Sequence, residues 1–253
     1  MTVLTRPLIC LLGALAPLAP LAAGAADTFT RQFPIASCDF RPSGGNAFFR
    51  LLENRQLYLS NIRCVQSGDC EELVELRITM LPETRNVTFE YAGKTVTART
   101  RVMEEYETVD GELDEISRNY VADCSPMHDV YYFGEDVEDG DGHRLPDSWL
   151  AGRNGARPGI LMPDRAFLLG SRYYQELADN AKDRAEHTAM GLTIEVPAGT
   201  YRGCIEVTET TPLEPGEEAP KNYCPGVGFV RDDEGLELVA VYENAASPAR
   251  RAH

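Results

Sequence analysis

The side chains best suited to chemistry or ligand binding gather in one stretch near the middle of the chain. Tyr131 and Tyr132 are adjacent aromatic residues, Glu135 and Asp136 are adjacent acids, and Trp149, the only tryptophan, follows them. Small-ligand sites combine aromatic surfaces with a few polar groups in this way. We therefore predict a ligand-binding site from these five residues, with Trp149 also suited to a buried anchoring role because of its size.

A hydrolase is an alternative interpretation of the same two acids. Glycosidases place two carboxyl groups across a cleft. Neighbouring residues of a strand point to opposite faces, so Glu135 or Asp136 would need a distant partner. The sequence has no H-x-H, H-E-x-x-H or G-x-S-x-G motif and no glycine-rich phosphate loop flanked by strand and helix. The sequence favours a non-enzymatic protein, and we name no catalytic residue.

Calcium is the one cofactor that the pattern admits. Glu138, Asp139 and Asp141 place carboxylates close together, with Gly140 and Gly142 interleaved. Calcium takes six to eight oxygen ligands from loops of this kind. The EF-hand spacing fails, since a third oxygen ligand and the terminal glutamate are missing. A solvated acidic turn is the simpler interpretation, and a calcium-stabilised structural module remains the alternative.

A strand and a loop must position these residues. Residues 130–133 are β-branched and aromatic, which is typical of a half-buried strand, and Gly134 is expected to interrupt it. An acidic turn is expected over residues 135–141. The segment 152–163 is rich in glycine and proline, so we predict a structured loop that folds back on the aromatic face of the strand.

The rest of the chain alternates apolar and polar residues with period two, as half-buried strands do. The clearest cases are residues 74–80, 87–91, 192–196 and 236–242. Asp110-Gly111 is a strong hairpin signal, and a short helical turn is expected near residues 179–183. Many strands joined by short turns predict an all-β fold, with curved antiparallel sheets that form a barrel or sandwich and only short helical turns.

The cysteines predict an exported protein with disulfides. Six cysteines lie after residue 25, an even number that is typical of an oxidising compartment. Cys64 and Cys70 flank a short turn, and Cys204 and Cys224 flank the turn at residues 215–216. We therefore predict the pairs Cys64–Cys70 and Cys204–Cys224, which leaves Cys38 to pair with Cys124.

The first residues resemble a secretory signal peptide. Arg6 precedes an apolar run over residues 8–21, and small residues at 23–25 suit cleavage. This apolar run is shorter than a membrane helix. We predict a signal peptide over residues 1–25, a single β-rich domain over residues 26–245 and a disordered tail over residues 246–253, with no membrane span and a periplasmic or secreted location.

The net charge of the chain limits the classes of partner that it can bind. The formal net charge is −16, and removing the signal with its one arginine leaves −17. So acidic a protein is a poor partner for nucleic acid and for anionic membranes. It is compatible with binding cations.

The second half of the chain carries a series of motifs in a fixed order. They are Y-Y-F-G-E-D-V (131–137), S-W-L-A-G-R-N-G-A-R-P-G-I-L-M-P (148–163), Y-Y-Q-E (173–176), V-P-A-G-T-Y (196–201), T-T-P-L-E-P-G (210–216) and N-Y-C-P-G-V-G-F-V (222–230). With these motifs the chain resembles a family of uncharacterised exported bacterial β-rich proteins. The resemblance implies an exported β-rich protein and no particular activity. This chain differs from the family pattern at Cys224, where alanine is commoner, which suggests added disulfides.

These observations predict an exported acidic β-domain that binds a small ligand or another protein of the cell envelope. A hydrolase using Glu135 or Asp136 and a calcium-stabilised structural module are the two alternatives. An apolar cavity enclosed by the curved sheet would favour ligand binding.

Overall fold

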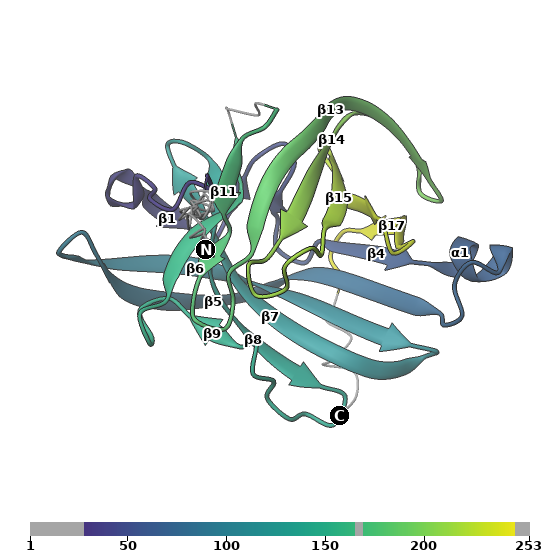
Figure 1. Ribbon diagram of the computed structural model, residues 1–253, viewed down its shortest axis with the longest axis horizontal. Helices are drawn as coiled ribbons and strands as arrows, with labels where there is room; N and C mark the ends of the chain where they lie inside the picture. The colour runs from purple at the N-terminus through teal and green to yellow at the C-terminus, as the bar shows by residue number, and fades with distance from the viewer. Residues whose placement is uncertain (1–27, 165–168, 246–253) are drawn as a thin grey trace, which may run out of the picture.

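Fifteen antiparallel strands join into one sheet that curls back on itself. The computed structural model describes residues 28–164 and 169–245 (Figure 1). The predicted signal peptide and C-terminal tail therefore lie outside the described residues. The predicted all-β antiparallel fold is confirmed, and its form is a nearly closed barrel.

The path of the sheet begins and ends with two short strands that are neighbours in the sequence. In sheet order the strands are β11 (Arg172–Tyr174), β13 (Arg184–Val196), β14 (Gly199–Thr210), β15 (Ala219–Cys224), β16 (Gly228–Asp232), β17 (Glu237–Tyr242), β4 (Gln56–Ser60), β5 (Val74–Tyr91), β6 (Lys94–Val109), β7 (Glu112–Ser125), β8 (Asp129–Asp139), β10 (Arg157–Met162) and β12 (Glu176–Leu177). Two further strands pair beside this path, β1 (Asp39–Arg41) with β7 and β9 (Trp149–Leu150) with β8.

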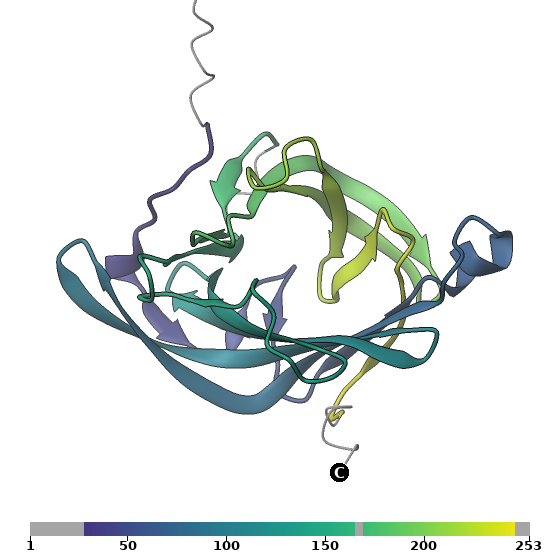
Figure 2. The same ribbon diagram turned by 60° about the horizontal axis from the view of Figure 1, so that its bottom comes forward.

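The chain itself links the two ends of this path. Gln175 is the one residue between β11 at one end and β12 at the other. The backbones pack closely here, since a Cβ added at Gly159 in β10 would lie 2.3 Å from the carbonyl oxygen of Tyr174. Figure 2 shows the result, with the blue-green strands β4 to β8 below and the green to yellow strands β13 to β17 arched above them.

Short elements complete the fold outside the sheet. They are η1 (Ile35–Ser37), the hairpin of β2 (Gly44–Gly45) and β3 (Arg50–Leu51), and α1 (Ile62–Ser67). The pattern of residues 62–67 did not predict α1. This helix ends at Gly68, which adopts the left-handed conformation that favours glycine, and the Cys64–Cys70 disulfide spans its end.

All three predicted disulfides are confirmed. They join Cys38 to Cys124, Cys64 to Cys70 and Cys204 to Cys224. Cys38–Cys124 ties the N-terminal segment to β7 across 86 residues of sequence. Because a cross-link that closes a long loop restricts the unfolded chain most, this bridge contributes more than the local one.

Two predictions of local structure were wrong. Gly134 does not interrupt the strand, because β8 continues to Asp139 and the turn begins later. No helical turn forms at residues 179–183. There the Asn180 amide donates to the carbonyls of Pro146 and Ser148, and the Asp183 N–H donates to the Glu176 carboxyl group. These long-range bonds replace the local bonds that a helical turn would make.

The predicted loop over residues 152–163 is in part a strand. It contains β10, which pairs with β8 on one side and with β12 on the other. The segment does turn back toward the preceding strand, but it pairs along the edge of β8 within the sheet and does not cover its aromatic face. Its glycines and prolines limit the length of the strand but do not prevent pairing.

Candidate ligand-binding cavity

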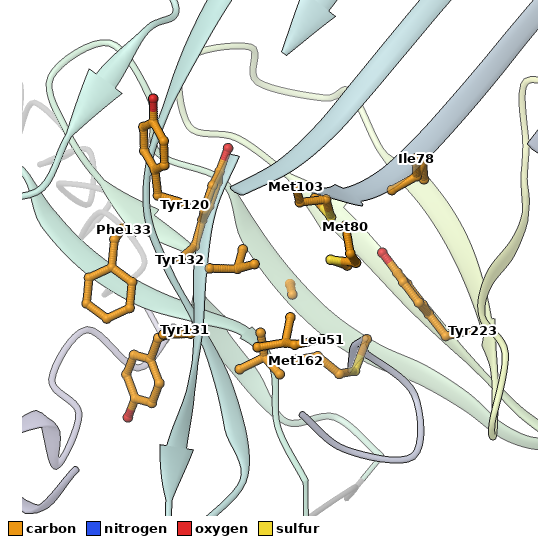
Figure 3. Packing of buried hydrophobic residues seen from close by; sticks show 14 of the residues in the cluster. Leu51, Ile78, Met80, Met103, Tyr120, Tyr131, Tyr132, Phe133, Met162 and Tyr223 are labelled. Atoms are coloured by element: carbon orange, nitrogen blue, oxygen red, sulfur yellow. The ribbon is translucent and has the colours of Figure 1, made fainter. Parts of the chain in front are cut away.

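The barrel encloses an open cavity of about 640 Å³. The alternation of side chains along a strand sends every second residue inward. Figure 3 shows Ile78, Met80 and Met103 near Tyr223 on one side of the packed region. The apolar part of the lining comes from six strands and two loops, and includes Leu57, Leu76, Ile78, Met80, Met103, Leu161, Tyr223, Val227, Phe229 and Leu236.

The remainder of the lining is strongly acidic. The same alternation that turns Met103 inward also turns Glu105 and Glu107 inward on β6. The carboxyl side chains that line the cavity are Glu105, Glu107, Glu115, Glu135, Asp147, Glu176, Asp183, Glu209, Glu214, Asp232, Asp233 and Glu234. The cavity therefore joins an apolar wall to an acidic one.

A β-bulge turns Tyr132 and Glu135 to the same side of β8. Asn119 of β7 pairs with Glu135, while Val121 pairs with Tyr132, so β8 carries one extra residue between these pairs. Bulges redirect side chains in this way. Gly134 makes the bulge possible, since its φ is +142° and an added Cβ would lie 2.6 Å from the carbonyl oxygen of Trp149.

Glu135 is a buried carboxyl group whose pKa is raised into the neutral range. The hydroxyl groups of Tyr132 and Ser117 lie 2.8 Å and 3.3 Å from its Oε2. Burial raises the pKa of Glu135 to about 7, and the nearby Glu105 adds to this rise, while the hydrogen bond from Tyr132 opposes it. A group with such a pKa exchanges a proton near neutral pH.

Other acids of the cavity have pKa values shifted in the same direction. Burial, with repulsion from Asp114 and Glu115, raises the pKa of Glu107 to about 7. Burial also raises the pKa of Glu105. The pKa of Glu176, which is only 2% exposed, rises well above its usual range because of burial and the nearby Asp183.

Lys221 is a basic residue that lines the cavity together with these acids. Its Nζ lies 2.5 Å from Oε2 of Glu209, and the amide of Gln175 donates to the other oxygen of Glu209 at 2.9 Å. Burial alone lowers the pKa of Lys221, but Glu209 more than offsets this and raises it. Lys221 is therefore charged and already occupied by one carboxylate.

The structure separates the five residues predicted to form a ligand site. Tyr132 and Glu135 line the cavity together. Trp149 lies beside Tyr132, with ring centres 5.3 Å apart, and is buried, as an anchoring residue would be. Tyr131 is fully buried on the other side of β8, where its ring contacts Phe40.

Asp136 also lies on the outer side of β8, away from Glu135. It accepts hydrogen bonds from Tyr120, from Arg85 at 2.9 Å and from Arg144 at 2.6 Å. Burial opposes ionisation, but the bonds from Tyr120 and Arg144 prevail and lower the pKa of Asp136. Glu135 and Asp136 therefore do not share one site, as the alternation of strand faces predicted.

The residues predicted to bind calcium lie at the end of β8 and in the following turn. Oδ1 of Asp139 accepts the backbone N–H groups of Asp141 and His143 at 3.0 Å and 2.8 Å. Glu138 points to Arg118, at 3.5 Å. Over residues 28–164 and 169–245, no three His, Cys, Asp or Glu side chains are grouped so as to hold a metal ion.

Sequence reasoning missed most of the acidic wall. The residues not predicted include Glu105, Glu107, Glu115, Glu176, Glu209 and Lys221. A signal was present on β6, where Met103, Glu105 and Glu107 share one face and change from apolar to acidic along it. Acids on one face of a strand ordinarily indicate solvent, and only the closure of the sheet makes that face internal.

Comparison with protein-family models, with curated proteins and with solved structures finds no match to this chain. The resemblance to exported bacterial proteins therefore stays a prediction. Within the residues that the structure describes, no helix is long and apolar enough to cross a membrane.

Proposed function

We propose that this protein is a non-enzymatic binding protein of the cell envelope that holds a small amphiphilic molecule inside its barrel. The observation that carries the proposal is the cavity, which is open, has a volume of about 640 Å³ and joins an apolar wall to a polar one. Small-molecule sites have volumes of a few hundred to about 1,000 Å³ and combine apolar walls with a few polar groups.

Two further features support this function and its location. The three disulfides are compatible with a periplasmic or secreted protein. The cavity is built on strands, and strands hold a binding site more firmly than loops do. The hydrolase alternative is less well supported, because Asp136 faces away from Glu135 and is engaged by two arginines.

Binding of a neutral fluorescent dye tests this function without assuming a charge on the ligand. N-phenyl-1-naphthylamine, which brightens in apolar surroundings, is expected to bind the purified protein saturably. Ala219 lines the cavity, so Ala219→Trp is expected to fill part of it and to weaken dye binding by about tenfold.

The matched control is Met190→Trp, because Met190 is 53% exposed and does not line the cavity. Thermal melts establish that both variants fold, and Leu161→Trp serves as a second cavity-filling variant. Dye binding that persists unchanged in both cavity-filling variants, or that falls equally in Met190→Trp, contradicts the proposed function.

A further inference from the structure

The lining of the cavity holds many more acidic than basic side chains. Three basic residues line it, against twelve carboxyl side chains. Each of the three already has a partner, since Lys221 contacts Glu209, Arg55 contacts Glu243 at 3.5 Å and Arg50 donates to the carbonyl of Gly226. The protein's own cations therefore leave most of the acidic wall unpaired.

The strand register places like charges directly opposite one another. Glu107 of β6 faces Glu115 of β7, and Glu105 is the next inward residue on β6. In the described part of the chain, no ion pair joins these three glutamates to a basic side chain. Because like charges in direct register destabilise a sheet, this arrangement works against the fold.

An amide at the border of the two walls also lacks a partner. Asn119 lines the cavity, is only 4% exposed, and pairs in register with Met103 on one side and Glu135 on the other. Its Oδ1 contacts the Tyr132 hydroxyl, and its Nδ2 has no hydrogen-bond partner among the described residues. Exchanging the two amide atoms would leave the oxygen unpaired instead. Buried polar groups rarely lack a hydrogen-bond partner, so the geometry indicates that a polar group of a ligand lies next to the Asn119 amide.

The apolar wall begins immediately beside these polar groups. Met103 faces Met80 across the strands, and Tyr223 packs against Phe229 with ring centres 5.6 Å apart. A bare inorganic ion would leave this apolar surface uncovered, whereas an organic body would cover it.

From this geometry we propose that the ligand is an organic cation, whose protonated amine lies among Glu105, Glu107 and Glu115 while its apolar body lies against Met80, Met103 and Tyr223. This inference rests on the proposed function and adds the chemical class of the ligand. The amine neutralises the facing glutamates, and a polar group near it pairs with the Asn119 amide.

Three probes with one tail and different head groups test the charge. Dodecylamine, 1-dodecanol and dodecanoate, each below its micelle concentration, compete with N-phenyl-1-naphthylamine at neutral pH. Dodecylamine is expected to bind about tenfold more tightly than dodecanol, and dodecanoate more weakly than both. Because burial raises the pKa of Glu105 and Glu107, binding of the amine is also expected to release protons, which calorimetry in two buffers detects.

Variants assign the preference to the cavity. Glu105→Gln combined with Glu107→Gln is expected to remove most of the preference for dodecylamine over dodecanol. Glu195→Gln is the matched control, since Glu195 is exposed on β13 and outside the cavity. Glu115→Gln serves if the double variant fails to fold.

Several outcomes would overturn the inference that the ligand is an organic cation. Equal binding of the amine and the alcohol overturns the cation inference and leaves the proposed function intact, as does tighter binding of dodecanoate. Dye binding with no competition from any of the three probes also overturns the inference. Displacement of the dye by calcium at lower concentration than by dodecylamine would replace the organic cation with a metal ion.

Discussion

The two sides of strand β8 differ in what they contribute to the molecule. On the outer side, Tyr131 and Phe133 are fully buried, and their rings lie 5.4 Å and 5.0 Å from the ring of Phe40. On the inner side, Tyr132 and Glu135 line an open cavity. Ordinary alternation along β8 separates Tyr131 from Tyr132, and the bulge at Gly134 places Phe133 and Glu135, two positions apart, on opposite sides.

The outer side of β8 has the features of a stabilising core, and the inner side does not. The outer side fills its space with aromatic rings in edge contacts, an arrangement that stabilises a fold. The inner side keeps an open volume and buries acids whose pKa values rise as a consequence. Acids held in this way weaken the fold at neutral pH, so their place in the cavity is better explained by binding than by stability.

The largest effect is expected from removing an aromatic ring on the outer side. Phe133→Ala leaves a cavity in a closed aromatic cluster, so the free energy of unfolding is expected to fall by about 3–5 kcal/mol. Phe229→Ala, on the wall of the open cavity, removes a ring of the same type and is expected to lower it by only about 1–2 kcal/mol. Urea titration measures both, and equal losses would contradict the comparison.

The acids of the inner side are expected to make stability depend on pH. The pKa of Glu135 is about 7 in the folded chain and has an ordinary value of 4.5, so between these values the folded chain holds more protons than the unfolded chain. Protonated Glu135 therefore stabilises the folded chain fully below pH 4.5. This stabilisation is lost as the pH rises toward about 7, and the loss in free energy of unfolding reaches up to about 3 kcal/mol.

Denaturation at several pH values from about 5.5 to 8 measures this loss. Glu135→Gln is expected to flatten the profile, whereas Glu195→Gln, on the exposed surface, leaves it unchanged. A wild-type protein that becomes more stable over this range would show that the inner acids are not held protonated.

The opposite sign is expected for Asp136 on the outer side. Because the pKa of Asp136 is lowered in the folded chain, its contribution to stability is fully present when the pH is above the ordinary pKa of an aspartate. That contribution is lost as the pH falls through the lowered pKa. Asp136→Asn is expected to cost about 1–2 kcal/mol at neutral pH, because Arg85 and Arg144 lose their partner. Asp141→Asn, in the exposed turn, is the control, and a loss as large there would contradict this role.

The smallest effect is expected from calcium. The Asp139 carboxylate already accepts two backbone N–H groups of its own turn, so calcium is expected to shift the melting temperature no more than matched ionic strength of sodium chloride. Melts in chelator, calcium and sodium chloride measure this. A calcium-specific rise that Asp139→Asn with Asp141→Asn abolishes would reinstate the calcium module.

Local signals predicted much of the fold. The Asp110-Gly111 hairpin joins β6 to β7 as expected, and the cysteines pair as their spacing around turns indicated. These features depend on residues near one another in the sequence, or on elimination after the near pairs are assigned. The strand through Gly134 was missed because a bulge depends on the neighbouring strand β7.

The cavity could be predicted only in part. Tyr132 and Glu135 were named from their residue types, but Glu209 and Lys221 come from strands far along the chain. Their approach to Glu105 depends on the closure of the sheet at Gln175, which no local pattern encodes. The two-residue period of the sequence shows which residues share a face of a strand. The closing of the sheet into a barrel decides which of the two faces lines the interior.

The link at Gln175 has a further consequence for how the molecule behaves among its own copies. A sheet with an open edge presents unpaired N–H and C=O groups, which invite strands from other chains and lead to aggregation. Here the two terminal strands, β11 and β12, are short and lie next to each other along the chain, and the backbone of Thr30 forms a bridge to Tyr173 of β11. The barrel that encloses the cavity therefore also leaves little unpaired strand edge with which another copy of the chain could associate.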